Sequence, residues 1–139
     1  MSAPLRVLLV EDNEGDVEMT RCALSESRPQ CKLSIANDGV AALELLSKLG
    51  DISLPQLIML DLNMPRMDGR QFLEHVKAEP HFKVIPVVML TSSESPDDIR
   101  SCYERHASCY VVKPFDGREF AGAIREIVSF WCTRGRTVV

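Results

Sequence analysis

Five short apolar segments, separated by longer segments with helical periodicity, constrain the fold of this chain more than any other feature of its sequence. The apolar segments are residues 5–10, 33–36, 57–60, 87–90 and 110–112. The strongest of them consist mainly of Leu, Val, Ile and Met, which is typical of strands buried on both faces of a parallel sheet. The segments with helical periodicity are residues 13–27, 38–49, 69–78, 96–106 and 116–131.

The residues at the starts of the helical segments support this division. Asn13 is a favourable N-cap, and Glu14 and Asp16 place negative charge in the first turn, where the helix dipole stabilises it. Ser95 followed by Pro96 combines an N-cap with a proline in the first turn. Strand and helix therefore alternate five times. Because parallel strands need crossover connections, this order predicts an α/β fold in three layers, with helices on both sides of a sheet.

The length of 139 residues predicts one domain. We expect this domain to cover residues 1–132, with a short C-terminal tail over residues 133–139. The longest apolar runs are far shorter than the roughly 20 residues that a membrane span needs, and no secretory signal stands at the start of the sequence. We therefore expect a cytoplasmic protein without membrane contacts.

The charge argues against a protein that binds nucleic acid or anionic lipid, and the spacing of the cysteines argues against a C-x-x-C motif or a zinc site. The net charge is −4 and the isoelectric point about 5.4, whereas a surface that binds nucleic acid or anionic lipid is basic. No two cysteines have C-x-x-C spacing, and no group of Cys and His has the spacing of zinc ligands. We expect buried, reduced thiols at Cys22, Cys31, Cys102, Cys109 and Cys132.

Polar residues stand directly after four of the predicted strands. They are Glu11 and Asp12 after the first strand, Asp61 and Asn63 after the third, Thr91 after the fourth and Lys113 after the fifth. In open α/β sheets, binding sites form beyond the carboxyl ends of the strands. Three carboxylates brought together there repel one another and need a cation. Hard oxygen ligands of this kind suit Mg²⁺.

Phosphoryl transfer is the chemistry that this set of residues favours. Mg²⁺ and Lys113 together balance the three carboxylates and leave a site that can accept an anionic group. Asp61 is the candidate nucleophile because it stands at the end of a strand. A phosphoryl group on it would be held by Mg²⁺, by Lys113 and by the Thr91 hydroxyl, the usual components of such a site. Each motif alone is common in loops, and only their combination in this order favours the function.

Four motifs of the sequence resemble those of the receiver domain of response regulators in two-component signalling. They are VLLVEDN, LDLNMPRMDG, MLTSS and YVVKPF, in the order and spacing of that family. The stretches VEDNEGD and YVVKPFDGREF and the closing Phe130 and Trp131 further resemble the small single-domain regulators of phytochrome-type histidine kinases. The resemblance implies a flavodoxin-like fold: a five-stranded parallel sheet of order 2-1-3-4-5, flanked by five helices.

The resemblance also implies roles for the residues at the strand ends. Asp61 is similar to the aspartate that accepts a phosphoryl group from a kinase phosphohistidine, and Lys113 to the lysine that pairs with this group. Glu11, Asp12, Asp61 and the backbone carbonyl of Asn63 are similar to the ligands of Mg²⁺ or Mn²⁺. Glu11 departs from the aspartate of some members by one additional methylene.

Further residues resemble the parts of the family that respond to phosphorylation. Thr91 and Tyr110 are similar to a switch pair, in which the hydroxyl moves towards the phosphoryl group and the aromatic ring turns inward. Asn63 and Ser93 stand at positions where the family tunes the lifetime of the phosphoryl group.

The resemblance implies protein partners for signalling and no enzymatic turnover of a separate substrate. We expect a sensor histidine kinase, specifically of the phytochrome type, as the phosphoryl donor. We expect no effector domain in the chain, so the output is expected from residues 96–106, 109–112 and 116–131. Through this surface the chain would form a homodimer, or bind a downstream protein or phosphotransfer partner.

Two other functions fit part of the sequence. A Mg²⁺-dependent aspartyl-phosphate phosphatase also uses a strand-end aspartate and a lysine, but it needs a general acid two residues after the nucleophile, where Asn63 stands. A pseudo-receiver that binds partners without phosphorylation is the second alternative. The complete set of acidic residues and Lys113 argues against it.

Overall fold

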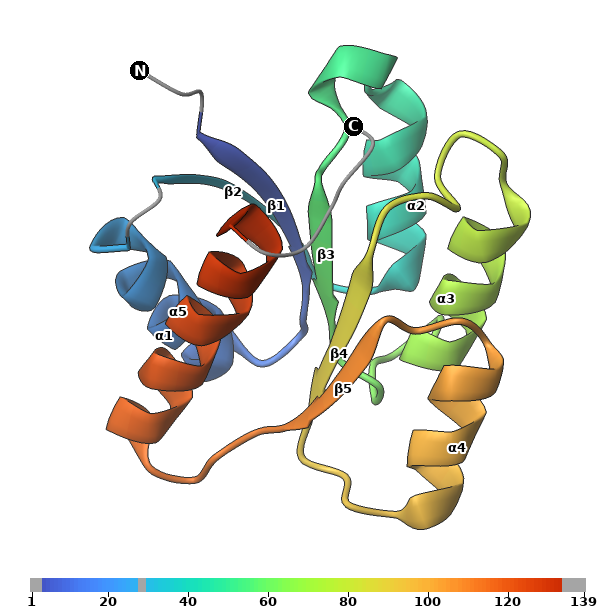
Figure 1. The fold of residues 1–139 in the computed structure, drawn as a ribbon. Coiled ribbons are helices and arrows are strands. Elements are labelled where there is room, and N and C mark those ends of the chain that lie inside the picture. The colour runs from blue at the N-terminus through green and yellow to red at the C-terminus, as the bar shows by residue number, and fades with distance from the viewer. Residues whose placement is uncertain (1–3, 28–29, 134–139) are drawn as a thin grey trace.

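Five parallel strands and five helices alternate along the chain (Figure 1) in the computed structural model, which describes residues 4–27 and 30–133. The strands are β1 (Leu5–Val10), β2 (Cys31–Ala36), β3 (Leu57–Leu60), β4 (Val87–Thr91) and β5 (Cys109–Val112). The helices are α1 (Glu14–Ser25), α2 (Gly39–Lys48), α3 (Gly69–Ala78), α4 (Pro96–Glu104) and α5 (Gly117–Thr133). A short 3₁₀ helix, η1 (Asp51–Ser53), leads from α2 towards β3.

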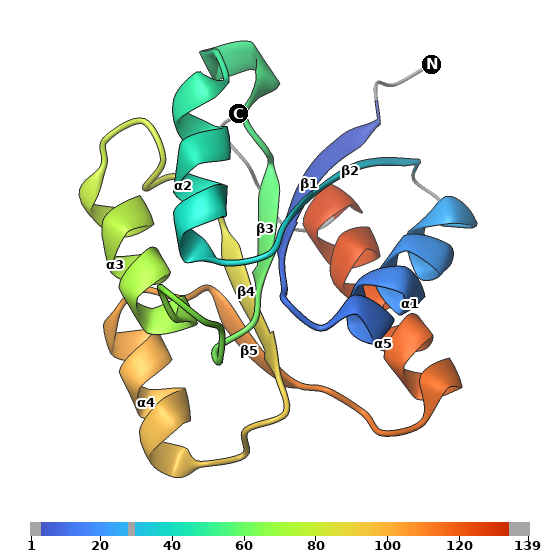
Figure 2. The same ribbon diagram turned by 180° about the vertical axis from the view of Figure 1, so that it is seen from behind.

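The strands form one sheet in the order β2-β1-β3-β4-β5, and every neighbouring pair is parallel. Helices α1 and α5 cover one face of the sheet, and α2, α3 and α4 cover the other (Figures 1 and 2). The predicted fold class and strand order are confirmed. Because all strands run in the same direction, their carboxyl ends meet at one edge of the sheet.

Each face of the sheet has its own apolar core. Leu46, Ile58 and Phe72 belong to the core under α2, α3 and α4, while Leu9 and Ile124 belong to the core under α1 and α5. None of these five side chains is more than 2 % exposed. Burial of β3 and β4 on both faces explains why their segments are continuously apolar in the sequence.

The predicted helix starts are confirmed where side chains cap them. The Asn13 side chain accepts a hydrogen bond from the backbone N–H of Asp16 at 2.9 Å and so begins α1. The Ser95 hydroxyl accepts one from the N–H of Asp98 at 3.3 Å and begins α4. Both caps fix the helices that follow β1 and β4, next to the edge where the strands end.

The end of α4 differs from the prediction, because the helix stops at Glu104 and the chain turns at His106. His106 has a positive φ of 71°. Its N–H donates to the Tyr103 carbonyl at 3.0 Å, and the N–H of Ala107 donates to the Cys102 carbonyl at 3.1 Å. These two bonds form a Schellman motif, in which the left-handed position is usually glycine.

The cysteines are less buried than predicted. Cys102 is buried and Cys31 and Cys109 are half-buried, but Cys22 and Cys132 are exposed. The expectation of buried thiols is therefore wrong for the last two, which lie on α1 and α5. Burial raises the pKa of the Cys31 and Cys102 thiols.

The domain boundary remains a prediction at the C-terminus. Helix α5 extends to Thr133, one residue into the expected tail, and residues 134–139 lie outside the described part of the chain. No helix within residues 4–27 and 30–133 has the length and hydrophobicity needed to cross a membrane.

Candidate functional site

A cleft of about 440 Å³ lies where the strands end. Five predicted site residues line it: Asp12, Asp61, Asn63, Thr91 and Lys113. Three other residues also line it: Asn13, Asp16 and Ser92. The parallel sheet therefore brings together side chains from the ends of β1, β3, β4 and β5, as the topology requires.

An acidic cluster forms at this cleft. Glu11, Asp12 and Asp61 offer carboxylate oxygens within 4.8 Å of one another. Glu11 is 2 % exposed and Asp61 8 %, whereas Asp12 is open to solvent. Crowded carboxylate oxygens are the donors that Mg²⁺ and similar hard divalent cations prefer. The residues present therefore fit a divalent metal ion.

Glu11 has the most perturbed acidity of the cluster. Its pKa is raised from 4.5 to about 7, mainly because burial disfavours the charged carboxylate. A hydrogen bond from Lys113 opposes this effect, and the negative charge of Asp61 adds to it. Without a metal ion, Glu11 is therefore half-protonated near neutral pH, and a divalent cation would favour its charged form.

Lys113 is the cation of the site. Its Nζ donates to Glu11 Oε1 at 2.6 Å and to Asp16 Oδ2 at 2.7 Å, and it lies 3.8 Å from Asp61 Oδ2. Burial of the ammonium acts to lower its pKa, but the bonds to Asp16 and Glu11 outweigh this effect, so the pKa of Lys113 is raised. Lys113 therefore stays protonated at the end of β5.

The backbone around β3 fixes the position of Asp61. Its N–H donates to the Val10 carbonyl at 3.0 Å, and its Oδ1 accepts from the N–H of Leu62 at 2.8 Å. The first residue of α3, Gly69, donates its N–H to the Leu62 carbonyl at 2.7 Å. A Cβ on Gly69 would come within 2.4 Å of the Asp61 carbonyl oxygen. Only glycine allows α3 to begin so close to the aspartate.

The predicted switch residues form a separate set of contacts. Thr91 is fully buried at the cleft, and its hydroxyl oxygen accepts from the N–H of Ser93 at 3.5 Å. The Tyr110 hydroxyl donates to the Ser93 carbonyl at 2.9 Å, and its ring packs against the core. The Ser93 hydroxyl donates to Asp98 at 2.5 Å. Ser93 and Tyr110 therefore lie outside the cleft and hold the loop between β4 and α4.

Asp16 is the site residue that the sequence did not reveal. Its position predicted only a favourable interaction with the helix dipole, yet its carboxylate binds Lys113. One signal was present in the sequence. Side chains of a helix lean towards its N-terminus, and α1 begins just after β1, so an acid in its first turn points back towards the strand ends.

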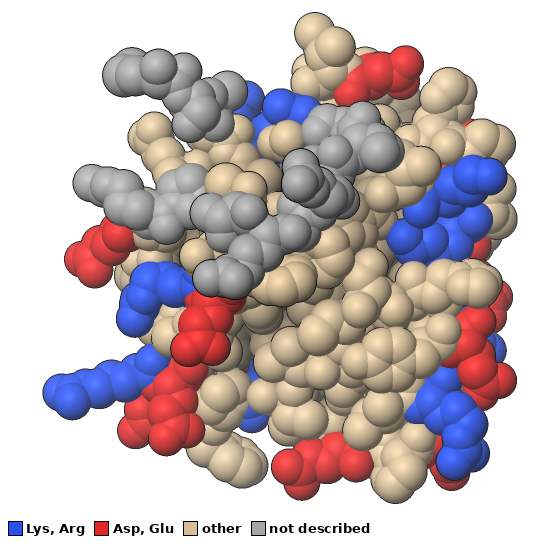
Figure 3. Space-filling view, in the orientation of Figure 1, with Lys and Arg blue, Asp and Glu red and all other residues tan. Residues whose placement is uncertain are grey.

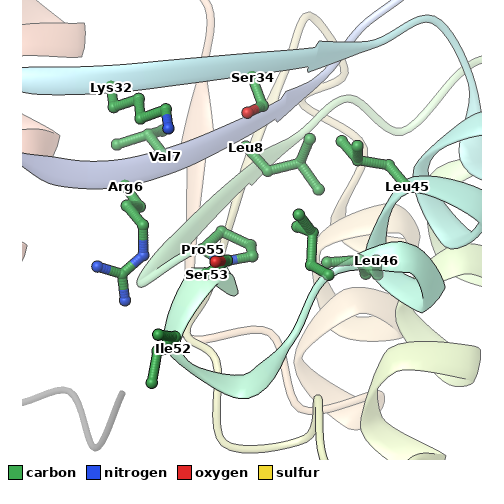
Figure 4. A pocket seen from close by; sticks show the side chains of 11 residues that line it. Arg6, Val7, Leu8, Lys32, Ser34, Leu45, Leu46, Ile52, Ser53 and Pro55 are labelled. Atoms are coloured by element: carbon green, nitrogen blue, oxygen red, sulfur yellow. The ribbon is translucent and has the colours of Figure 1, made fainter.

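A second hollow of about 200 Å³ lies at the opposite end of the strands (Figure 4). Arg6 of β1 and Lys32 of β2 line it together with Leu45 and Leu46 of α2. The Arg6 Nε already donates to the Leu54 carbonyl at 2.8 Å. This hollow is therefore separate from the acidic cleft and has no part in its chemistry.

Comparisons with known proteins identify the family. A family model described as the response regulator receiver domain matches residues 7–125. Response regulator Rcp1 of Synechocystis is 39 % identical over 131 residues, which cover 92 % of this chain and 89 % of that protein.

Solved structures of relatives share the fold over nearly the whole chain. The phosphorylated cyanobacterial phytochrome response regulator RcpA has a TM-score of 0.92 at 34 % identity, covering 99 % of this chain and all of that one. The Mn²⁺-bound form of Rcp1 has a TM-score of 0.88 at 37 % identity, covering 98 % and 100 %. The strand order, the acidic cleft and these matches together show that the chain belongs to the response regulator receiver family.

Proposed function

We propose that this protein is a response regulator that accepts a phosphoryl group on Asp61 from a histidine kinase in a Mg²⁺-dependent reaction. The observation that carries the proposal is the position of one Asp61 oxygen. Carboxylate oxygens of Glu11, Asp12 and Asp61 lie within 4.8 Å of one another, and Asp61 Oδ2 lies 3.8 Å from the Lys113 Nζ. A nucleophile, a cation and a cluster suited to a metal ion therefore stand together.

The metal ion would be held by the Asp12 and Asp61 carboxylates, with Glu11 nearby and with Asn63 contributing its carbonyl. When bound, Mg²⁺ would neutralise charge on the transferring phosphoryl oxygens. Rcp1, whose structure is similar to this one, has a Mn²⁺-bound form, which supports binding of a divalent ion by this protein.

In the transfer itself, an Asp61 oxygen attacks the phosphorus of the donor phosphohistidine. The new bond joins oxygen to phosphorus, and the nitrogen–phosphorus bond breaks. Its electron pair stays on the imidazole, which takes up a proton. Lys113 and the Thr91 hydroxyl then stabilise the negative oxygens of the phosphoryl group on Asp61.

The response to phosphorylation would begin at Thr91 and Lys113, because only contacts that differ between two states can shift their equilibrium. Thr91 is joined to Ser93 by a hydrogen bond, and Ser93 to Tyr110. Movement of Thr91 would therefore reach the loop before α4 and strand β5. We also propose that Asn63, exposed at the cleft, and Ser93, within this chain of contacts, tune the phosphoryl lifetime.

The kinase is proposed to be of the phytochrome type, because the similar protein RcpA is a phytochrome response regulator. A kinase histidine must approach the cleft from solvent. Phe115, two residues after Lys113 in the segment between β5 and α5, is fully exposed. Aromatic side chains, Phe included, are enriched in the interfaces between proteins.

The output surface is proposed to be α4, β5 and α5, through which two copies of the chain would associate. Strand β5 is an edge strand whose four residues are all only half-buried. An apolar groove beside it is lined by Cys109, Ile127, Phe130 and Trp131. Figure 3, seen from the β5 edge, shows a broad area without charged side chains in the middle of this face. Edge strands with apolar surroundings are commonly covered by a partner.

Incubation with Mg²⁺ and acetyl phosphate, followed by intact-mass measurement, tests the phosphoryl acceptor. We expect one phosphoryl group per chain, removed by hydroxylamine, and no adduct on Asp61→Asn. The matched control is Asp97→Asn, which changes an exposed aspartate of α4 and should be phosphorylated like the wild type. Sustained release of phosphate would instead indicate a phosphatase. Absence of an adduct on the wild type would indicate a pseudo-receiver.

Sedimentation with and without beryllofluoride tests the output surface. We expect Phe130→Glu to weaken self-association, because it places a charge on the apolar groove. Val84→Glu is the matched control, since Val84 is 45 % exposed and Phe130 49 %, and Val84 lies outside α4, β5 and α5. A wild-type chain that stays monomeric at high concentration in both conditions would remove the homodimer from the proposal.

A further inference from the structure

Asp16 has no part in the phosphoryl-transfer steps, yet it makes one of the two shortest contacts of Lys113. The Lys113 Nζ lies 2.7 Å from Asp16 Oδ2 and 2.6 Å from Glu11 Oε1, but 3.8 Å from Asp61 Oδ2. The ammonium is therefore displaced from Asp61 towards α1. Any contact between Lys113 and a phosphoryl group on Asp61 has to compete with this arrangement.

The position of Asp16 is fixed by its surroundings. Its backbone N–H donates to the Asn13 side chain at 2.9 Å, and its carbonyl accepts from the Thr20 hydroxyl at 2.8 Å. Held at both ends in the first turn of α1, the residue can direct its carboxylate towards the cleft, which it lines. The contact with Lys113 therefore follows from the way in which the first turn of α1 holds the backbone of Asp16.

Asp16 and Glu11 differ in how easily they can release Lys113. The Glu11 side chain is 3 % exposed, and its other oxygen accepts from the N–H of Asn13 at 3.2 Å. The Asp16 side chain is 21 % exposed. Water can therefore hydrate the Asp16 carboxylate when the lysine leaves, whereas a charged Glu11 without its lysine would remain buried.

We infer that Asp16 is a positioning residue that holds Lys113 away from Asp61 in the resting protein and thereby opposes formation of the phosphorylated state. The inference rests on the proposed function, because it assumes that Lys113 pairs with a phosphoryl group on Asp61. Phosphorylation would transfer the ammonium from Asp16 to the phosphoryl oxygens. The strength of the contact between Asp16 and Lys113 would then set how favourable the phosphorylated state is relative to the resting state.

The test measures the affinity of beryllofluoride, which mimics a phosphoryl group on aspartate, in saturating Mg²⁺ by NMR titration. We expect Asp16→Asn to bind it about two- to fivefold more tightly than the wild type, the range expected for loss of one partly exposed ion pair. Asp16→Ala should act in the same direction, and Asp16→Glu, which keeps the charge, should restore affinity towards the wild-type value.

The control Glu14→Gln removes the same unit of charge from the same turn of α1 at an exposed residue, and it should change the affinity less than twofold. Equal tightening by Glu14→Gln would show a general charge effect and overturn the inference. Unchanged or weaker binding by Asp16→Asn would also overturn it. Failure of the wild type itself to bind beryllofluoride would instead contradict the proposed phosphorylation of Asp61, so the two outcomes are distinct.

Discussion

Substitution of Glu11 by glutamine should make the metal-free protein more stable at pH 8 but not at pH 4.5. The pKa of Glu11 is raised from 4.5 to about 7, chiefly by burial. The carboxyl therefore binds a proton more tightly in the folded than in the unfolded chain. Since one pKa unit corresponds to 1.36 kcal/mol, ionised Glu11 lowers the free energy of unfolding by about 3 kcal/mol above pH 7.

The sign of the pH dependence follows from this difference in pKa. Below pH 4.5 the carboxyl is protonated in both states and costs nothing, and the cost grows as the pH rises from 4.5 to 7. Glutamine resembles the protonated acid and can still accept a hydrogen bond from Lys113. The advantage of Glu11→Gln should therefore be less than about 0.5 kcal/mol at pH 4.5 and about 3 kcal/mol at pH 8.

Urea unfolding in EDTA at pH 4.5, 6 and 8 measures this difference. The matched control is Glu44→Gln, which removes an exposed carboxylate from α2. A stability difference between Glu11→Gln and the wild type that does not grow with pH would refute the reasoning.

Three further predictions concern metal binding and packing. Mg²⁺ at 100 times its dissociation constant should stabilise the fold by about 2.7 kcal/mol, which for 139 residues raises the melting temperature by about 9 °C. A thermal scan that shows no rise with Mg²⁺ would refute the metal site. His106→Gly should raise the free energy of unfolding by about 1 kcal/mol, because glycine adopts a positive φ without strain. An unchanged midpoint of urea unfolding would contradict this prediction. Phe72→Ala should lower it by about 3–5 kcal/mol, because the ring is fully buried between α3 and the sheet, and a loss below 1 kcal/mol would contradict that packing.

The sequence predicted the sheet and the positions of its site residues because both depend on local patterns and on topology. Once β1, β3, β4 and β5 are parallel, the residues at and just after their carboxyl ends must meet, and Asp12, Asp61, Thr91 and Lys113 do so. The start of β2 was missed by two residues because Cys31 and Lys32 interrupt its apolar pattern. As an edge strand, β2 tolerates them.

Two features could not be predicted because they depend on tertiary context. The contact between Asp16 and Lys113 joins residues 97 positions apart, and the choice of Lys113 between three carboxylates depends on distances that no local pattern contains. The turn at His106 was missed because histidine is not the residue that signals a left-handed position. In both cases the packing of whole elements decides the local structure.

The close approach of α3 to the end of β3 has a consequence for mutational screens. The atoms nearest to a Cβ on Gly69 are backbone atoms, so any larger residue there would collide with the carbonyl of Asp61 and the Cα of Leu62. A saturation library scored by signalling output would therefore rank Gly69 beside the phosphoacceptor. Such a score would reflect the close spacing between α3 and the end of β3. Without the structure, the score would suggest a catalytic role for a glycine whose contribution is steric.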